Sequence, residues 1–376
     1  MRFGYAYWGF LGDEKMDAEG RELSTPDGNA TYSWSIIYEA LKRGWSVFKM
    51  HEDRDLHAWR RKGRDLFSAF NSAKRLDAYQ YSTPTEGWAL PELDILLIEW
   101  RWPIPGRNCN VENGRVYFNG AGPLDHPDRD LQRQIQLLNH YKNKKTKIVI
   151  WDLDHKLTEE DERIWSPNAI FETSRKPRKL LLDRVKVEPP TIISDLSEFI
   201  TLPSDVHRKL VYVGSRYERD DVIEEWIKPV SDKFPGEVEF WGNWTRPEIL
   251  NEVKKMWPNI KYNGRITTKD FRKAYGDAVA CPLLAKKSYL ETGFITPRPW
   301  EALLFGTIPV GLSTHYGIEN YVMRECIAKD ADDLADTVEW LAGMNEGHRR
   351  FFREENIKLI SHMDVKNFVD ELEKVR

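Results

Sequence analysis

The stretch that best indicates the fold class is Gly293–Gly311, GFITPRPWEALLFGTIPVG. Only Arg298 and Glu301 are charged in this stretch, and the run that follows them is almost wholly apolar. The pattern predicts a helix over 298–305, a glycine turn and a strand in TIPVGL. A strand that is apolar throughout is typical of a parallel sheet with helices on both faces. The stretch therefore predicts an α/β fold.

The same alternation of strand and helix extends outward from this stretch in both directions. In the second half, strands are predicted in KLVYVGS, EVEFWGN, IKYNGRI and AVACPLL, with helices over 224–232 and 269–275. In the first half, strands are predicted at Phe3–Trp8, Ser46–Met50, Asp94–Glu99 and Lys147–Trp151, with helices at Ser33–Arg43 and Leu131–Tyr141. Asn113-Gly114 lies between two short strand patterns and predicts a β-hairpin.

A chain of 376 residues suits two domains. We predict two doubly wound Rossmann-like α/β domains, 1–190 and 191–350, that face a central cleft. The segment Lys176–Ser194 has few periodic positions and is predicted to link them. Residues 351–376 are predicted to form a C-terminal helix that packs back on the first domain. Because ligands bind at the carboxyl ends of such strands, the cleft is the expected site.

Composition excludes several classes of protein. Hydrophobic residues are 41% and aromatic residues 12%, which indicates a packed globular chain. The net charge of −4 shows no global sign of nucleic-acid binding. The three cysteines are widely spaced, without a CxxC pair, so neither a disulfide framework nor a zinc site is expected. No apolar run approaches the roughly 18 residues of a membrane span, so no membrane association is expected.

Charged residues follow several strands of the second half. Arg298 and Glu301 share one face of a helix's first turn, where free N–H groups and the helix dipole favour phosphate. An arginine can form paired hydrogen bonds to phosphate, and a glutamate can accept hydrogen bonds from the hydroxyls of a ribose. The alternative is a surface pair that caps an ordinary helix.

Two further strand ends carry residues of the same kind. Gly214, Ser215, Arg216 and Arg219 follow the strand KLVYV, where glycine permits close approach of the backbone and arginine can meet a diphosphate. NGRI ends another strand, where backbone groups of Arg265 and Ile266 could pair with a base edge. Taken singly, each is equally compatible with a loop that carries solvated charges.

Together these motifs are similar to one known family. LVYVGSRYER, EVEFWGN, NGRI and GFITPRPWEAL, in that order, resemble the DNA β-glucosyltransferases of T-even bacteriophages, most closely over residues 205–311. The resemblance implies the two-domain GT-B fold. It also implies transfer of glucose from UDP-glucose to the hydroxymethyl group of a modified pyrimidine in duplex DNA, with inversion at the anomeric carbon. The first domain would then bind DNA and the second the UDP-sugar.

The resemblance assigns roles residue by residue in the second domain. It implies that Arg298 binds the diphosphate and Glu301 the ribose. Ser215, Arg216 and Arg219 fall where the family has a serine and two phosphate-binding arginines, but the loop is shorter here, so which arginine takes which role is open. Arg265 and Ile266 match the strand end that contacts uracil.

The catalytic base is expected in the first domain. KIVIWDLDHKL places Asp152 and Asp154 at the end of a strand, on the same side, where a carboxylate can take a proton from an attacking hydroxyl. A helix cap or a metal-binding pair is the alternative. Alignment with the family puts the catalytic aspartate at Asp154, with Asp152 and His155 as second choices.

The first loop of the chain differs from the family. Gly9 follows the first strand, where its backbone could approach the donor sugar or phosphates, although a plain tight turn is the alternative. The family has a glutamate at the start of its first helix, and gapless matching places Tyr32 there. That role is therefore missing or is supplied by another residue such as Asp27.

Two basic clusters suggest contacts with DNA. Residues 41–75 hold ten Lys or Arg against four Asp or Glu, with aromatic residues among them. Such clusters suit phosphate binding, although solvated helix faces are the alternative. The predicted DNA contacts are Arg60, Arg61, Lys62 and Arg64 in WRRKGR, and Arg175 and Lys176 in SRKPRK.

The expected partners follow from the resemblance. They are a UDP-sugar donor and double-stranded DNA whose target base is flipped out of the helix. The protein is expected to be a monomer that a phage encodes and that acts in the cytoplasm of the infected bacterium. Modification of the DNA would protect it from restriction. The chemistry needs no cofactor, with Mg²⁺ or Mn²⁺ as an aid to UDP, and no metal-ligating residue is predicted. The alternatives are a GT-B transferase for a small-molecule or surface-glycan acceptor, and a binding module without turnover.

Overall fold

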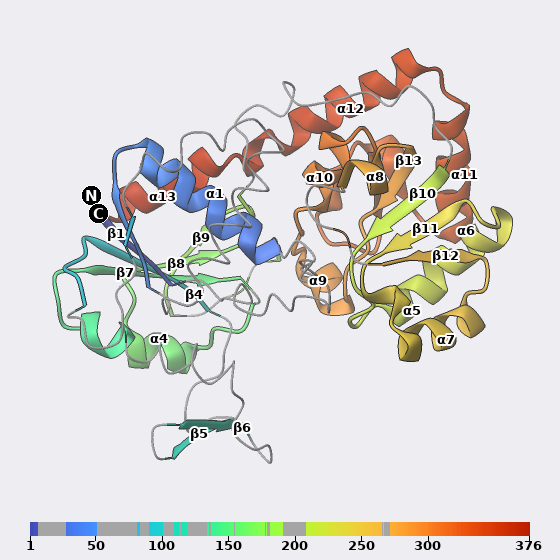
Figure 1. The fold of residues 1–376 in the computed structure, drawn as a ribbon. Coiled ribbons are helices and arrows are strands. Elements are labelled where there is room, and N and C mark those ends of the chain that lie inside the picture. The colour runs from blue at the N-terminus through green and yellow to red at the C-terminus, as the bar shows by residue number, and fades with distance from the viewer. Residues whose placement is uncertain are drawn as a thin grey trace.

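The computed structural model describes residues 1–6, 28–50, 81–82, 90–100, 109–112, 115–118, 134, 137–153, 155–176, 178, 181–190, 208–264, 266 and 271–376. These residues build two α/β domains, each with its own parallel sheet (Figure 1). The predicted fold class, two doubly wound α/β domains of the GT-B type, is confirmed.

The first domain is built on a seven-stranded sheet in the order β3-β2-β1-β4-β7-β8-β9, and all its pairs are parallel. Its strands are β1 Arg2–Ala6, β2 Ser46–Lys49, β3 Tyr81–Ser82, β4 Ile95–Glu99, β7 Lys147–Asp152, β8 Ala169–Glu172 and β9 Arg184–Lys186. The predicted hairpin is confirmed, since β5 Cys109–Glu112 pairs antiparallel with β6 Arg115–Phe118.

The second domain is built on a six-stranded sheet in the order β12-β11-β10-β13-β14-β15, again wholly parallel. The strands are β10 Arg208–Val213, β11 Val238–Trp241, β12 Ile260–Asn263, β13 Ala278–Pro282, β14 Ile308–Leu312 and β15 Ile327–Ala328. The chain first moves outward from β10 to β12 and then returns to β13 on the other side. The carboxyl ends of β10 and β13 therefore flank the point where ligands bind in folds of this kind.

Helices cover both faces of each sheet because successive strand residues point to opposite sides. On β10, Leu210 and Tyr212 share a core with α11, whereas Val211 and Val213 share another with α8. The α-helices among the described residues are α1 Gly28–Lys42, α4 Glu159–Trp165, α5 Asp220–Val222, α6 Lys228–Lys233, α7 Pro247–Met256, α8 Phe271–Tyr275, α9 Lys287–Thr292, α10 Arg298–Leu304, α11 Ala331–Gly343, α12 Glu346–Ile360 and α13 Val365–Val375.

The C-terminal helices cross between the domains. Helix α12 packs on α10 and β14 of the second domain, and α13 packs on α1 and β7 of the first. Phe368 of α13 lies 4.8 Å from Trp151 and 5.4 Å from Phe171, measured between ring centroids. Figure 1 shows α13 beside α1, so that both termini of the chain lie on the first domain.

Several predicted boundaries need correction. The predicted linker 176–194 contains strand β9, which forms the edge of the first sheet, and β3, β8 and β15 were not predicted. The helix predicted over 224–232 is part of a helical run from Asp220 to Lys233 that includes a π-helical turn at Ile223–Ile227. Strands of two or three residues carry too little periodicity to be recognised before their neighbours are known.

Candidate functional site

Arg298 lies across the point where the strand order of the second sheet reverses. It is the first residue of α10 and only 8% exposed. Its Nε donates to the Val213 carbonyl, 2.8 Å away at the end of β10, and its Nη1 donates to the Leu284 carbonyl, 2.9 Å away beyond β13. The guanidinium is therefore fixed where a doubly wound sheet binds its ligand.

The guanidinium of Arg298 packs against an aromatic ring and a glycine. The guanidinium lies 4.7 Å from the ring centroid of Tyr212, and Nη2 donates to the Tyr212 hydroxyl at 3.2 Å. A Cβ atom on Gly214 would lie 2.5 Å from Nη2 of Arg298 and 2.5 Å from the Tyr212 hydroxyl, so a side chain there would displace them. Gly214 therefore permits the close approach that the sequence predicted at this strand end.

Arg219 places a second buried cation in the same region. It is 8% exposed, and its Nη1 donates to the carbonyls of Tyr217 at 2.7 Å and Ser215 at 3.3 Å. Burial lowers the pKa of Arg219, and the Arg298 cation acts in the same direction. Among the described residues, no carboxylate lies within 4.0 Å of either guanidinium. Two buried cations without a paired anion favour an anionic ligand.

Glu301 adds a buried carboxylate one helical turn after Arg298. It is 9% exposed, and burial raises its pKa to about 7, against the opposing effects of Arg298 and a hydrogen bond from Tyr275. The Tyr275 hydroxyl lies 3.5 Å from Oε2 of Glu301. This carboxylate is held near the cations without pairing with them, which leaves its oxygens suited to ligand hydroxyls.

The other predicted residues of this domain divide into two groups. Ser215 and the buried Ile266 lie with Arg219 and Arg298 around the end of β10. Arg216 instead turns away, since its Nε donates to Asp220 at 2.8 Å and its Nη1 to Glu252 at 2.6 Å. Its charge is already balanced by two carboxylates, so Arg219 is better placed than Arg216 to meet a phosphate. Arg265 lies outside the described residues.

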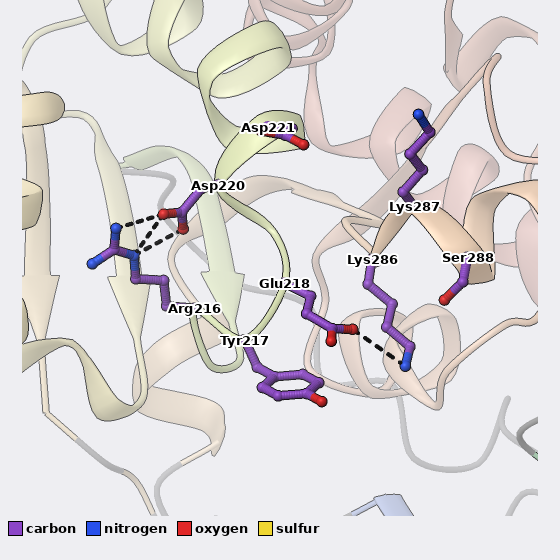
Figure 2. A pocket seen from close by; sticks show the side chains of 8 residues that line it. All are labelled: Arg216, Tyr217, Glu218, Asp220, Asp221, Lys286, Lys287 and Ser288. Atoms are coloured by element: carbon purple, nitrogen blue, oxygen red, sulfur yellow. Dashed lines mark hydrogen bonds and ion pairs between the residues drawn. The ribbon is translucent and has the colours of Figure 1, made fainter.

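A pocket of about 630 Å³ lies beside the loop that carries Arg219. Figure 2 shows Glu218 of this loop and Lys286, at the start of α9, pointing toward each other across it, with Nζ to Oε2 at 3.5 Å. Lys286 also lies 4.4 Å from the ring centroid of Tyr289. The eight lining residues are Arg216, Tyr217, Glu218, Asp220, Asp221, Lys286, Lys287 and Ser288. The pocket has the size of an ordinary small-molecule site.

Of the residues predicted as catalytic base in the first domain, the structure describes Asp152 and His155. Asp152 ends β7 and has no exposed surface. Its Oδ1 accepts from the backbone N–H of Lys156 at 2.7 Å and of Leu157 at 3.1 Å, and its Oδ2 pairs with Arg178. These contacts count against Asp152 as a proton acceptor. Asp154, the preferred base, lies outside the described residues.

The basic residues predicted to contact DNA are also only partly described. Arg60, Arg61, Lys62 and Arg64 lie outside the described residues, as does Gly9. Arg175 is half-buried at the contact between the domains. Its Nε donates to the Tyr321 hydroxyl at 2.9 Å and its Nη2 to Glu188 at 2.5 Å. The N–H of Lys176 donates to the Thr292 carbonyl at 2.9 Å, and its side chain is exposed. A DNA role for Arg175 stays a prediction, and its internal contacts count against it.

Sequence reasoning did not identify Tyr212, Tyr275, Arg178 or Lys286. Tyr212 and Tyr275 lie in apolar patterns that equally describe core residues, so no local signal distinguishes them. Arg178 was visible only as part of a basic cluster. Lys286 follows the strand AVACP, and strand ends of this kind were the signal that found the other residues.

The described residues contain no group of three or more His, Cys, Asp or Glu side chains placed to hold a metal ion. Within the same residues, no helix combines the length and apolar character needed to cross a membrane.

We compared the whole chain with known protein families, curated sequences and solved structures. No family model and no curated protein sequence matches the chain. A mutant of T4 phage beta-glucosyltransferase with UDP-glucose matches with a TM-score of 0.61 and 13% identity, over 100% of this chain and 99% of that one. An alpha-glucosyltransferase with UDP and a 13-mer DNA matches with a TM-score of 0.61 and 12% identity, over 100% and 99%. Anabaena HepE with UDP and glucose matches with a TM-score of 0.56 and 10% identity, over 100% and 98%. The chain therefore has the two-domain GT-B fold of these glucosyltransferase structures.

Proposed function

We propose that this protein is an inverting glycosyltransferase that moves glucose from UDP-glucose to the hydroxymethyl group of 5-hydroxymethylcytosine or 5-hydroxymethyluracil in duplex DNA. The proposal includes a phage origin and action in the cytoplasm of the infected bacterium. The T4 enzyme and the alpha-glucosyltransferase share the fold, and the latter was solved with DNA.

One observation carries the donor half of the proposal. Arg298 and Arg219 are buried at the reversal point of the second sheet, and among the described residues neither has a carboxylate partner. A diphosphate supplies the missing negative charge, with oxygens that match the fork of a guanidinium. Glu301 lies on the same helix, where its carboxylate can accept hydrogen bonds from ribose hydroxyls.

The proposed reaction is a single displacement. Asp154 takes the proton of the acceptor hydroxyl, whose oxygen attacks the anomeric carbon and forms the new glycosidic bond. The bond from that carbon to the β-phosphate oxygen breaks, and UDP leaves with the electron pair. Arg298 and Arg219 stabilise the charge that grows on the leaving diphosphate. Because attack and departure occur on opposite sides, the configuration inverts.

An acceptor base within a duplex must be extruded before its hydroxymethyl group can reach the donor. Extrusion costs a few kcal/mol, which contacts with DNA phosphates must offset. The cluster Arg60, Arg61, Lys62 and Arg64 is the proposed source of these contacts.

A transferase for a small-molecule or surface-glycan acceptor is the second candidate. Its support is the shared fold with Anabaena HepE, solved with UDP and glucose. In that case the donor residues keep their roles, and the basic cluster is a solvated surface.

The decisive experiment is incubation of the protein with UDP-glucose and duplexes that carry each modified base. A gain of one hexose in the mass of the modified nucleoside supports the proposal. UDP release that needs no DNA and rises with small hydroxylated acceptors would favour the second candidate. UDP binding without any turnover would favour a binding module.

The affinity for UDP-glucose is expected to rise as the pH increases through about 7. Burial raises the pKa of Glu301 to about 7, so this carboxyl is largely protonated below neutrality. The ionised form is the better acceptor for ribose hydroxyls, so binding favours it and releases a proton at lower pH. Calorimetry with UDP-glucose on both sides of neutrality measures the effect. Glu301→Gln should remove the pH dependence, and an unchanged profile in this variant would assign the dependence to another group.

Removing charge from the WRRKGR cluster is expected to weaken DNA binding and flatten its salt dependence. Each lost phosphate contact should lower the slope of log affinity against log salt by about 0.9. The measurement compares the double substitution of Arg60 and Arg61 by Ser with a matched pair, Lys254→Ser and Lys255→Ser, on the exposed surface of α7. Equal slopes in both variants would place the DNA surface elsewhere.

A further inference from the structure

Arg178 belongs to the basic segment SRKPRK, yet its side chain is directed into the first domain. Only 20% of it is exposed. Its Nη2 pairs with the Asp152 carboxylate, its Nη1 donates to the His155 carbonyl at 3.0 Å, and its Nε lies 3.4 Å from Oε1 of Glu172. One guanidinium therefore joins the ends of β7 and β8 to the turn that follows β7.

The turn after β7 is held on both sides of residue 154. Asp152 binds forward to the N–H groups of Lys156 and Leu157. His155 has a left-handed backbone with φ of 60°, which a residue other than glycine keeps only where its surroundings hold it. The Nε2 of its ring lies 3.1 Å from Glu172. Arg178 binds Asp152, two residues before Asp154 in the chain, and His155, the residue after it.

The same cation balances the buried negative charge of Asp152 and lies beside a second carboxylate, Glu172. Burial raises the pKa of Asp152, and Arg178 acts most strongly against that rise. For Glu172, burial would raise the pKa, but hydrogen bonds with His155 and Lys186 outweigh it and the pKa is lowered. Removing Arg178 would leave a carboxylate without exposed surface and without its cation, which disfavours the ionised form and the packing around it.

We propose that Arg178 is a positioning residue of the transfer reaction, which fixes the turn carrying Asp154 by binding the Asp152 carboxylate and the His155 carbonyl. The inference rests on the proposed function, since it assigns Arg178 a part in the reaction within the first domain, whereas the proposed donor residues lie in the second. It replaces the surface role that a basic cluster suggests for this residue.

The test compares Arg178→Met and Arg178→Lys with a matched control, Arg184→Met. Arg184 is a buried arginine of the same domain, paired with Glu162 at 2.5 Å, and has no contact with the turn after β7 among the described residues. Transfer of glucose to modified duplex DNA gives kcat and its pH profile, and calorimetry gives UDP affinity. Hydrogen exchange of the Lys156 and Leu157 amides reports on the turn without reference to activity.

Arg178→Met is expected to lower kcat on the order of 10²-fold, as a misplaced catalytic group does, and to leave UDP affinity unchanged. The acid limb of the kcat profile should move to higher pH, because the positive charge that Arg178 brings to the end of β7 has been removed. The two amides should exchange faster. Arg178→Lys should recover part of kcat, and Arg184→Met should keep the wild-type profile and exchange.

Two outcomes overturn the proposal. The first is that Arg178→Met keeps the wild-type kcat and pH profile. The second is that kcat falls while the pH profile and the hydrogen exchange of the Lys156 and Leu157 amides stay unchanged, as expected for a merely structural role. If Arg178→Met does not fold, Asp152→Asn decides, because its amide oxygen still accepts from Lys156 and Leu157 but lacks the charge that Arg178 binds. A wild-type protein without turnover would overturn the proposed function together with this role, whereas an active wild type with an unaffected variant overturns this role alone.

Discussion

Asp154→Asn is expected to lower the turnover of glucose transfer by roughly 10²–10⁴-fold, the usual contribution of a general base. Asparagine keeps the size and much of the hydrogen bonding of aspartate but cannot accept the proton. UDP-glucose affinity should survive, because the residues proposed to bind the donor lie in the other domain. Turnover is measured at saturating donor and acceptor, with UDP affinity measured by calorimetry on the same preparation.

Two further variants make this result specific to Asp154. Asp183→Asn removes an exposed carboxylate from the same domain and should behave as wild type. Asp152→Asn should cost less than Asp154→Asn, because Asp152 is buried and bound to the turn and to Arg178. Near wild-type turnover in Asp154→Asn would remove it from the mechanism. If Asp152→Asn alone abolished turnover, the role of base would pass to Asp152.

Arg298→Met is expected to weaken UDP binding on the order of 30- to 4,000-fold in Kd. Truncating one partner of a buried charged pair typically costs about 2–5 kcal/mol, and this range of Kd is that cost converted. Methionine retains much of the side-chain volume but loses the charge and the hydrogen bonds to Val213 and Leu284. Calorimetry measures Kd, and thermal unfolding establishes that the variant is folded.

Three comparisons sharpen this prediction. Arg298→Lys keeps the charge without the forked geometry and should lie between Met and wild type. Arg219→Met should also weaken UDP binding, and more than Arg216→Met, because Arg216 is already paired with Asp220 and Glu252. Arg272→Met, on the exposed face of α8, is the matched control. A folded Arg298→Met protein with wild-type affinity would place the diphosphate elsewhere.

The sequence by itself determined the alternation of strands and helices in both domains. Runs such as 95–98 and Ile308–Leu312 are apolar throughout because both faces of a parallel sheet are buried, and that composition is visible without a partner strand. Asn113-Gly114 predicted the hairpin because the preference of this residue pair for a tight turn is local. Arg298 and Glu301 were candidates because a helix start can be read from the residues beside it.

Only the tertiary structure decided where the charged side chains point. Arg216 and Arg219 are three residues apart in one loop, and the sequence treats them alike. Arg216 is neutralised by Glu252, which lies 36 residues away and is brought there by α7. Arg219 remains buried beside Arg298, so the two arginines differ through packing that no local pattern records.

The same holds for the basic segment SRKPRK and for the strand that follows it. Arg175 faces the contact between the domains, and Arg178 faces the turn after β7. Both are placed there because β9 pairs with β8 and holds this segment against the sheet. A three-residue edge strand gains its hydrogen bonds from a neighbour on one side only, so its own residues carry little signal. The direction of a long cationic side chain depends on which distant carboxylates the completed fold brings within reach, and Coulombic attraction at that range exists only after the chain has folded.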